Sequence, residues 1–129
     1  MSAAQFVYVL VERQGLVSAR GLGYYLPPLF DDDGFIHAST RDQLVKSANQ
    51  FYSHASEVIA MEVDSTLISS ILKYEPGASG TLYPHIYGAL RLSDVSRFIT
   101  ITRTGTGAFE LPEELQGDVS PPTKPISPT

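Results

Sequence analysis

The sequence contains no cysteine, which excludes disulfide bonds, cysteine-based zinc sites, iron–sulfur clusters and thiol nucleophiles. Only 18% of its residues are charged, and the formal net charge is −5. This acidic balance argues against binding to a phosphate backbone, which requires clustered lysine and arginine. No segment approaches the roughly 20 consecutive apolar residues of a membrane span. We therefore expect a cytoplasmic protein that binds neither nucleic acid nor a membrane, and whose chemistry depends on histidine, tyrosine, serine and carboxylates.

The chain has 129 residues, of which 43% are hydrophobic, and this is enough for one domain with one core. The composition changes after Glu110, where five of the nine prolines lie and large apolar residues are sparse. Proline removes a backbone donor and fixes φ, so such a segment joins a helix or sheet poorly. We predict a single catalytic or ligand-binding domain over residues 1–105. Residues 106–129 are expected to form a proline-rich tail that is mobile or draped over the surface.

The apolar pattern predicts an alternation of strands and short helices. Residues 5–12 form a nearly continuous apolar run, which is typical of a strand buried on both faces or central in its sheet. Thr40-Arg-Asp-Gln43 has the form of a capping box and begins a helix that is predicted to end near Ser53. Glycine and proline interrupt residues 13–30, which predicts a loop with at most one helical turn. Further predicted elements are strands at 35–38, 57–63, 72–75 and 95–102, and a short helix at 65–72 capped by Asp64. These elements indicate an α+β fold with a compact, mixed but mainly antiparallel sheet and a few short helices.

The first candidate segment is Gly34-Phe-Ile-His-Ala-Ser-Thr40. His37 precedes a helix N-terminus, where Ser39, Thr40 and free backbone amides would bind an anion or a carbonyl group. A histidine beside such a corner would exchange a proton with the bound group. The structural alternative is that Ser39 and Thr40 only cap the helix and that His37 ties two backbone segments together.

The second candidate segment is Leu82-Tyr-Pro-His-Ile-Tyr-Gly88. His85 and Tyr87 alternate along the chain, so on an extended backbone they share one face and would form an acid/base pair. In the structural alternative, His85 bonds to a loop and Tyr87 covers the edge of the core.

Glu75 lies between Tyr74 and Pro76, where an aromatic setting would raise the pKa of its carboxyl group and make it a general acid, or would let it stabilise a cationic transition state. The alternative for Glu75 is an exposed carboxylate at a turn.

The remaining titratable groups indicate structural roles. His54 lies at the predicted end of the long helix, where a partly cationic histidine suits the helix dipole. Asp31, Asp32 and Asp33 lack the spaced ligands of a calcium loop, and no histidine spacing typical of a metal site accompanies them. We therefore expect no metal site.

Taken in order, the two histidine segments and several others resemble the domain-of-unknown-function 952 family over about residues 6–102. The other segments are Gln43, Ala48-Asn-Gln-Phe51, Met61-Glu-Val-Asp64 and Lys73-Tyr-Glu75. The resemblance implies an ADP-ribosyltransferase-like fold, but no established activity comes with it. The first strand of that family usually carries Tyr-His, where this chain has Tyr8-Val9. Valine offers neither a donor nor an acceptor to a dinucleotide, so we expect no cofactor, with NAD as the alternative.

Three hypotheses follow from these residues. The first is a metal-independent enzyme of secondary metabolism that isomerises, cyclises or dehydrates a small, largely apolar organic molecule. His37 and His85 would be acid and base, and Tyr87 and Ser39 would polarise the substrate. The residues expected to bind the substrate are Ser39, Thr40, Phe35, Tyr83 and Tyr8. The second is an NAD-dependent ADP-ribosyl- or phosphotransferase-like enzyme in which Glu75 stabilises an oxocarbenium-like state. The third is a ligand-binding module without catalysis, in which both histidines maintain structure.

Overall fold

The computed structural model describes residues 5–28 and 30–116 and places them in three antiparallel sheets and a few short helices. The sheets have the strand orders β1-β4-β8, β3-β6-β5 and β2-β7. The strands are β1 (Phe6–Val11), β2 (Tyr24–Tyr25), β3 (Ile36–His37), β4 (Glu57–Asp64), β5 (Leu72–Pro76), β6 (Leu82–Ile86), β7 (Leu90–Arg91) and β8 (Val95–Thr102). The helices are α1 (Arg13–Leu22), α2 (Phe30–Asp33) and α3 (Leu44–Phe51), with 3-10 turns η1 (Arg41–Gln43), η2 (Ser65–Ile68), η3 (Leu92–Asp94) and η4 (Glu113–Leu115). The expected α+β class with mainly antiparallel sheets is confirmed.

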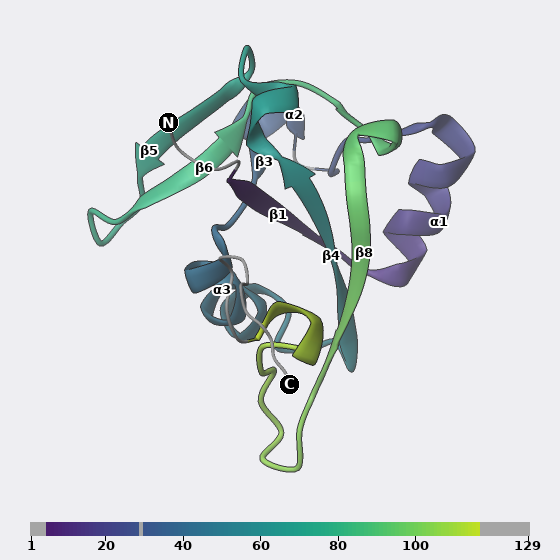
Figure 1. The fold of residues 1–129 in the computed structure, drawn as a ribbon, viewed down its shortest axis with the longest axis vertical. Helices are drawn as coiled ribbons and strands as arrows, with labels where there is room; N and C mark the ends of the chain where they lie inside the picture. The colour runs from purple at the N-terminus through teal and green to yellow at the C-terminus, as the bar shows by residue number, and fades with distance from the viewer. Residues whose placement is uncertain (1–4, 29, 117–129) are drawn as a thin grey trace, which may run out of the picture.

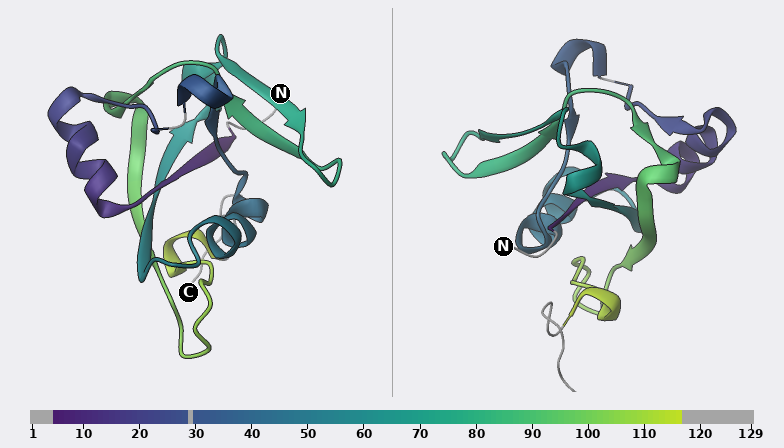
Figure 2. Two further views of the ribbon diagram at one scale, coloured as in Figure 1. Left: turned by 180° about the vertical axis from the view of Figure 1, so that it is seen from behind. Right: turned by 45° about the horizontal axis from the view of Figure 1, so that its top comes forward.

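Strands β1 and β4 are buried on both faces, which explains their continuous apolar runs, whereas β8 is buried mainly on one face. Alternate side chains of β1 and β4 enter two separate cores. One core contains Val9, Met61 and Leu16 of α1. The other contains Val58 and Leu44, the first residue of α3. The two helices lie on opposite sides of the sheet, as the views from front and back both show (Figures 1 and 2). Burial of β1 on both faces is thus confirmed, although β4 and not β1 is the central strand.

The loop predicted for residues 13–30 was wrong, because Arg13–Leu22 forms the ten-residue helix α1. Leu16 and Ala19 are buried three residues apart on one side of this helix. Gly23 adopts φ 86° and its N–H donates to the Ala19 carbonyl, so this glycine ends a helix. A Cβ at Gly15 would lie 2.9 Å from Val11 Cγ2, so this glycine permits a close approach of α1 to β1. Gly15 therefore marks the contact between α1 and β1, and Gly23 marks the end of α1.

Both predicted helix caps are present. The Thr40 N–H donates to Gln43 Oε1 at 3.0 Å within the capping box, which opens η1 and leads directly into α3. The Thr66 N–H donates to Asp64 Oδ1 at 2.9 Å. The element after Asp64 is only the turn Ser65–Ile68, because the chain enters β5 at Leu72. The helix predicted over 65–72 is therefore too long.

The chain after β8 folds back onto the β1-β4-β8 sheet. Phe109 and Leu115 are buried in the same core as Leu44. The Asn49 amide clamps the Phe109 backbone by accepting from its N–H at 2.9 Å and donating to its carbonyl at 3.2 Å. The packed domain thus includes residues beyond the expected boundary at 105. Of the expected proline-rich tail, residues 117–129 lie outside the described residues. Within the described ranges, no helix has the length and apolar character needed to span a membrane.

A backbone bridge joins the segment just after strand β3 of the β3-β6-β5 sheet to strand β1 of the central sheet. The Tyr8 N–H donates to the Ser39 carbonyl at 2.8 Å, and the Ser39 N–H donates to the Tyr8 carbonyl at 2.9 Å. The hairpin of β5 and β6 extends away from the central sheet (Figure 1). Ile36 and Ile86 pair across β3 and β6, and both enter the core. Because successive side chains of a strand point to opposite faces, the neighbours of these isoleucines form the outer face of this sheet.

Candidate functional site

The outer face of the β3-β6-β5 sheet brings the two histidine segments together. His37 and His85 are directly opposite each other in the antiparallel pair of β3 and β6, and Lys73 of β5 is opposite His85 on the other side. The ring centroids of His37 and His85 are 5.6 Å apart. The outer-face cluster, as we call it, comprises Phe35, His37, Lys73, Glu75, His85 and Tyr87. The cross-strand register therefore makes neighbours of segments about fifty residues apart in sequence.

Glu75 holds both polar groups of the second segment. Its Oε1 lies 2.7 Å from His85 Nδ1 and accepts a hydrogen bond from the Tyr87 hydroxyl at 2.5 Å. The hydrogen bond from Tyr87, followed by that from His85, holds the pKa of Glu75 below its usual value. Glu75 is therefore a carboxylate at neutral pH, and a carboxylate only accepts hydrogen bonds. The proton of neutral His85 must then lie on Nδ1, which leaves the lone pair on Nε2.

This arrangement corrects one expectation about Glu75. A raised pKa was expected, with a role as general acid, and the hydrogen bonds of its two partners produce a shift in the opposite direction. The same bond raises the pKa of Tyr87, because the phenol donates to a negative charge. Tyr87 therefore keeps its proton at neutral pH. Glu75 orients the histidine, and Tyr87 helps to hold Glu75 in place.

Aromatic contacts fix the His85 ring. Phe35 stacks on it with ring centroids 3.9 Å apart and an interplanar angle of 18°. His85 is 9% exposed, so it is largely withdrawn from water. His37 is much more exposed, and its Nε2 lies 3.2 Å from Asp33 Oδ2. Two histidine–carboxylate pairs of unequal exposure thus lie side by side, which suits a protected base and a solvent-exchanging acid.

The residues expected to bind the substrate are divided between this face and other parts of the fold. Tyr83 is opposite Glu75 in the pairing of β5 and β6, so it lies on the same face as the outer-face cluster. The Tyr8 hydroxyl donates to Glu62 at 2.9 Å, and burial raises the pKa of Tyr8. The Ser39 hydroxyl is buried and donates to Ser47 Oγ at 2.8 Å, while Thr40 serves in the capping box. For Ser39 and Thr40 the contacts thus follow the structural alternative.

We expect Ser39→Ala to lower stability without changing chemistry on the outer face. The variant leaves the Ser47 hydroxyl without its buried partner, which costs about 1–2 kcal/mol. Thermal denaturation would measure this loss, and the base-catalysed reaction described below would measure chemistry. A loss of rate at unchanged stability would instead place Ser39 in the site.

Three residues with specific contacts in the structure had no role assigned from the sequence: Asp33 and Lys73 at the outer-face cluster, and Arg97 beside Tyr8 and Glu62. Asp33 was considered only as a calcium ligand, whereas it is the last residue of α2 and its carboxylate reaches His37 of β3, four residues later. The Lys73 ammonium lies 5.1 Å from the centroid of the Tyr87 ring, a contact that only the strand register reveals. Arg97, the partner of buried Glu62, was read only as part of a strand. In the part of the chain that the structure describes, no group of three His, Cys, Asp or Glu side chains has the geometry of a metal site.

Comparison with known proteins identifies relatives of the same fold. The model of the family described as "Protein of unknown function (DUF952)" matches residues 10–98. The crystal structure of protein CC0527 from Caulobacter crescentus superposes with a TM-score of 0.78 at 24% identity, covering 85% of this chain and 97% of that chain. Its solution structure superposes with a TM-score of 0.71 over 80% of this chain and 90% of that chain, again at 24% identity. No curated protein matches the chain.

Proposed function

The chain belongs to the DUF952 family, whose name brings no activity with it, and from its own residues we propose that it is a metal-independent acid/base enzyme acting on a small, largely apolar organic molecule. His85 Nε2 removes a proton from the substrate, and His37 donates a proton at a second position. Reactions of this form include isomerisation, cyclisation and dehydration. Glu75 keeps His85 in the tautomer that the base requires.

One observation carries this proposal: Glu75 Oε1 contacts both His85 Nδ1 and the Tyr87 hydroxyl, and His37 is opposite His85 in the pair of β3 and β6. A carboxylate that orients an imidazole is a recurring device in which the second ring nitrogen becomes the working base. The Phe35 ring over His85 supports an apolar substrate, because small-molecule sites combine aromatic walls with a few fixed polar groups.

A model reaction that does not require the natural substrate tests whether His85 acts as a base. In 5-nitrobenzisoxazole, a base removes the proton of the ring carbon, the freed electron pair forms a nitrile, and the N–O bond breaks to release a coloured phenolate. We expect the protein to accelerate this ring opening beyond an equal concentration of free imidazole. His54→Ala should match the wild type, because His54 forms a comparable pair with Glu12 at 3.0 Å outside the cluster. A rate no higher than that of imidazole, or a loss of rate in His54→Ala, would contradict the proposal.

NAD-dependent transfer with an ADP-ribosyltransferase-like fold is the second candidate, because an ionised Glu75 would also stabilise an oxocarbenium-like state. Val9 argues against it. This side chain occupies the position of the family's histidine and is 1% exposed in the apolar core. We expect roughly millimolar NAD to leave the melting temperature unchanged, since a ligand stabilises only the state that it binds. A clear rise would favour NAD-dependent transfer over cofactor-free chemistry.

The third candidate is a ligand-binding module without catalysis, and measurements of stability and of base-catalysed rate distinguish it from the two enzymes. In that case variants of both histidines would lose stability, and no base-catalysed rate would depend on His85.

A further inference from the structure

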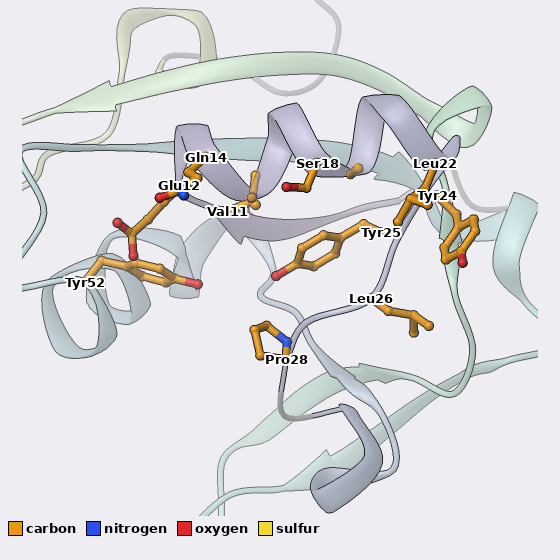
Figure 3. A pocket seen from close by; sticks show the side chains of 12 residues that line it. Val11, Glu12, Gln14, Ser18, Leu22, Tyr24, Tyr25, Leu26, Pro28 and Tyr52 are labelled. Carbon is orange, nitrogen blue, oxygen red and sulfur yellow. The ribbon is translucent and has the colours of Figure 1, made fainter.

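A cavity lies on the α1 side of the molecule and shares no residue with the outer-face cluster. It has a volume of about 420 Å³, is open to solvent on one side, and is lined by α1, by β2 with the segment that follows it, and by Tyr52 (Figure 3). This volume falls within the range of about 300–1,000 Å³ that small-molecule sites occupy. Its wall contains Val11 and Gly15, at the close contact between β1 and α1. The cavity is therefore built on regular elements.

The two ends of this cavity differ in chemistry. At one end the Tyr25 and Tyr52 rings reach toward each other, with the Glu12 carboxylate beside Tyr52 (Figure 3). At the other end lie Leu22 and Leu26 (Figure 3). Both leucines are exposed to solvent, at 63% and 41%. An occupant would cover them, so the cavity matches a molecule with one polar end and an apolar body.

The polar end carries negative charge and aromatic faces. Among the cavity-lining residues that the structure describes, Glu12 alone is charged. Burial raises the pKa of Tyr25 to about 12 and also raises that of Tyr52, so both rings carry neutral phenols at neutral pH. The Tyr52 hydroxyl donates to the Leu10 carbonyl at 3.2 Å, which fixes the ring. A carboxylate next to neutral aromatic rings attracts an organic cation.

We propose that this cavity binds a small organic ammonium ion with an apolar or aromatic body. The ammonium group pairs with Glu12 and lies near the Tyr25 and Tyr52 rings, and the body extends to Leu22 and Leu26. A neutral analogue loses the charge pair, and an anionic analogue is repelled by Glu12. The site is independent of the proposed acid/base chemistry.

The protein contains no tryptophan, so the fluorescence of an indole ligand can be followed without a background from protein tryptophan. The test titrates the protein into tryptamine, tryptophol and indole-3-propionate, which share an indole body and differ in the charge of the side chain. Fluorescence anisotropy gives the affinities, and backbone amide NMR shifts locate the site. We expect tryptamine to bind most tightly, with shifts in residues 12–26. Equal binding of tryptophol, or shifts confined to the outer-face cluster, would overturn the proposal.

Two variants distinguish the contribution of the Glu12 carboxylate to binding from that of its partner His54. Glu12→Gln keeps the shape and should weaken tryptamine binding about fivefold, the effect of a partly exposed charge pair. His54→Gln removes the 3.0 Å competitor of the ammonium group and should bind at least as tightly as the wild type. Glu57→Gln, which removes a carboxylate paired with Arg13 outside the cavity, is the matched control and should not change the affinity. Wild-type affinity in Glu12→Gln, or weakening in His54→Gln, would overturn the assignment.

Discussion

Replacing His85 with alanine is expected to reduce ring opening of 5-nitrobenzisoxazole to the solution background while the protein remains folded. A positioned base contributes about 10²–10⁴-fold to such a reaction, and His85 is the histidine whose free nitrogen is set by a carboxylate under an aromatic cover. The circular dichroism spectrum checks the fold of the variant. Retention of the wild-type rate by folded His85→Ala would place the base elsewhere.

Glu75→Gln tests the same base through its orientation. The glutamine amide group can donate to His85 Nδ1, which would move the imidazole proton to Nε2 and remove the lone pair that the reaction needs. We expect a rate loss of roughly a hundredfold, most of it in kcat, as for other histidine bases held in the wrong tautomer. Tyr87→Phe should have a smaller effect, because it leaves the bond between Glu75 and His85 intact.

Replacing Arg97 with methionine is expected to cause the largest loss of stability. Glu62 is 3% exposed in the central strand β4, and Arg97 donates to both of its oxygens at 2.9 and 2.7 Å. Without Arg97, the buried carboxylate keeps its hydrogen bonds from the described residues Tyr8 and Ser96. Because the Arg97 side chain is itself about half exposed, we expect a loss of about 2–3 kcal/mol, somewhat less than the roughly 3–5 kcal/mol for breaking a fully buried pair. Urea denaturation would measure it.

The double replacement of Glu62 and Arg97 by methionine provides the control, because it removes both charges together. It should recover much of the stability that Arg97→Met loses, since a buried pair adds little over apolar residues of similar size. If the single and double variants were equally unstable, the loss would reflect packing of the arginine stem and not the stranded carboxylate.

The pH dependence of stability follows from the same pair. Burial acts to raise the pKa of Glu62, but hydrogen bonds from Arg97, Ser96 and Tyr8 outweigh it and hold the pKa below its usual value. A carboxyl group with a lowered pKa in the folded state stabilises the protein above its unfolded pKa and loses that contribution as the pH falls through the folded one. Acid should therefore destabilise the wild type more than the double methionine variant.

The sequence identified five of the eight described strands (β1, β3, β4, β5 and β8) and the two histidine segments, because their signals are local. Continuous apolar runs, a capping box and His-x-Tyr alternation depend only on neighbours in the chain. It missed α1 because Gly15 and Gly21 resemble loop punctuation, whereas Gly15 owes its place to contact with Val11 in β1. It also missed the role of Glu75, since only the pairing of β5 with β6 brings this carboxylate to His85.

Contacts between residues distant in sequence also determine where the domain ends at its C-terminal side. Proline and sparse apolar residues predicted that the packed domain ends at 105, yet Phe109 and Leu115 fill a core that the β1-β4-β8 sheet would otherwise expose. Their burial depends on the distant Asn49 and Leu44, which no local pattern reveals.

The tautomer of His85 tests the central claim most directly. Nitrogen-15 chemical shifts and two-bond couplings of histidine-labelled protein distinguish Nδ1–H from Nε2–H. We predict that neutral His85 in the wild type carries its proton on Nδ1 and that Glu75→Gln shifts it toward Nε2. A wild-type His85 with its proton on Nε2 would contradict the proposed base.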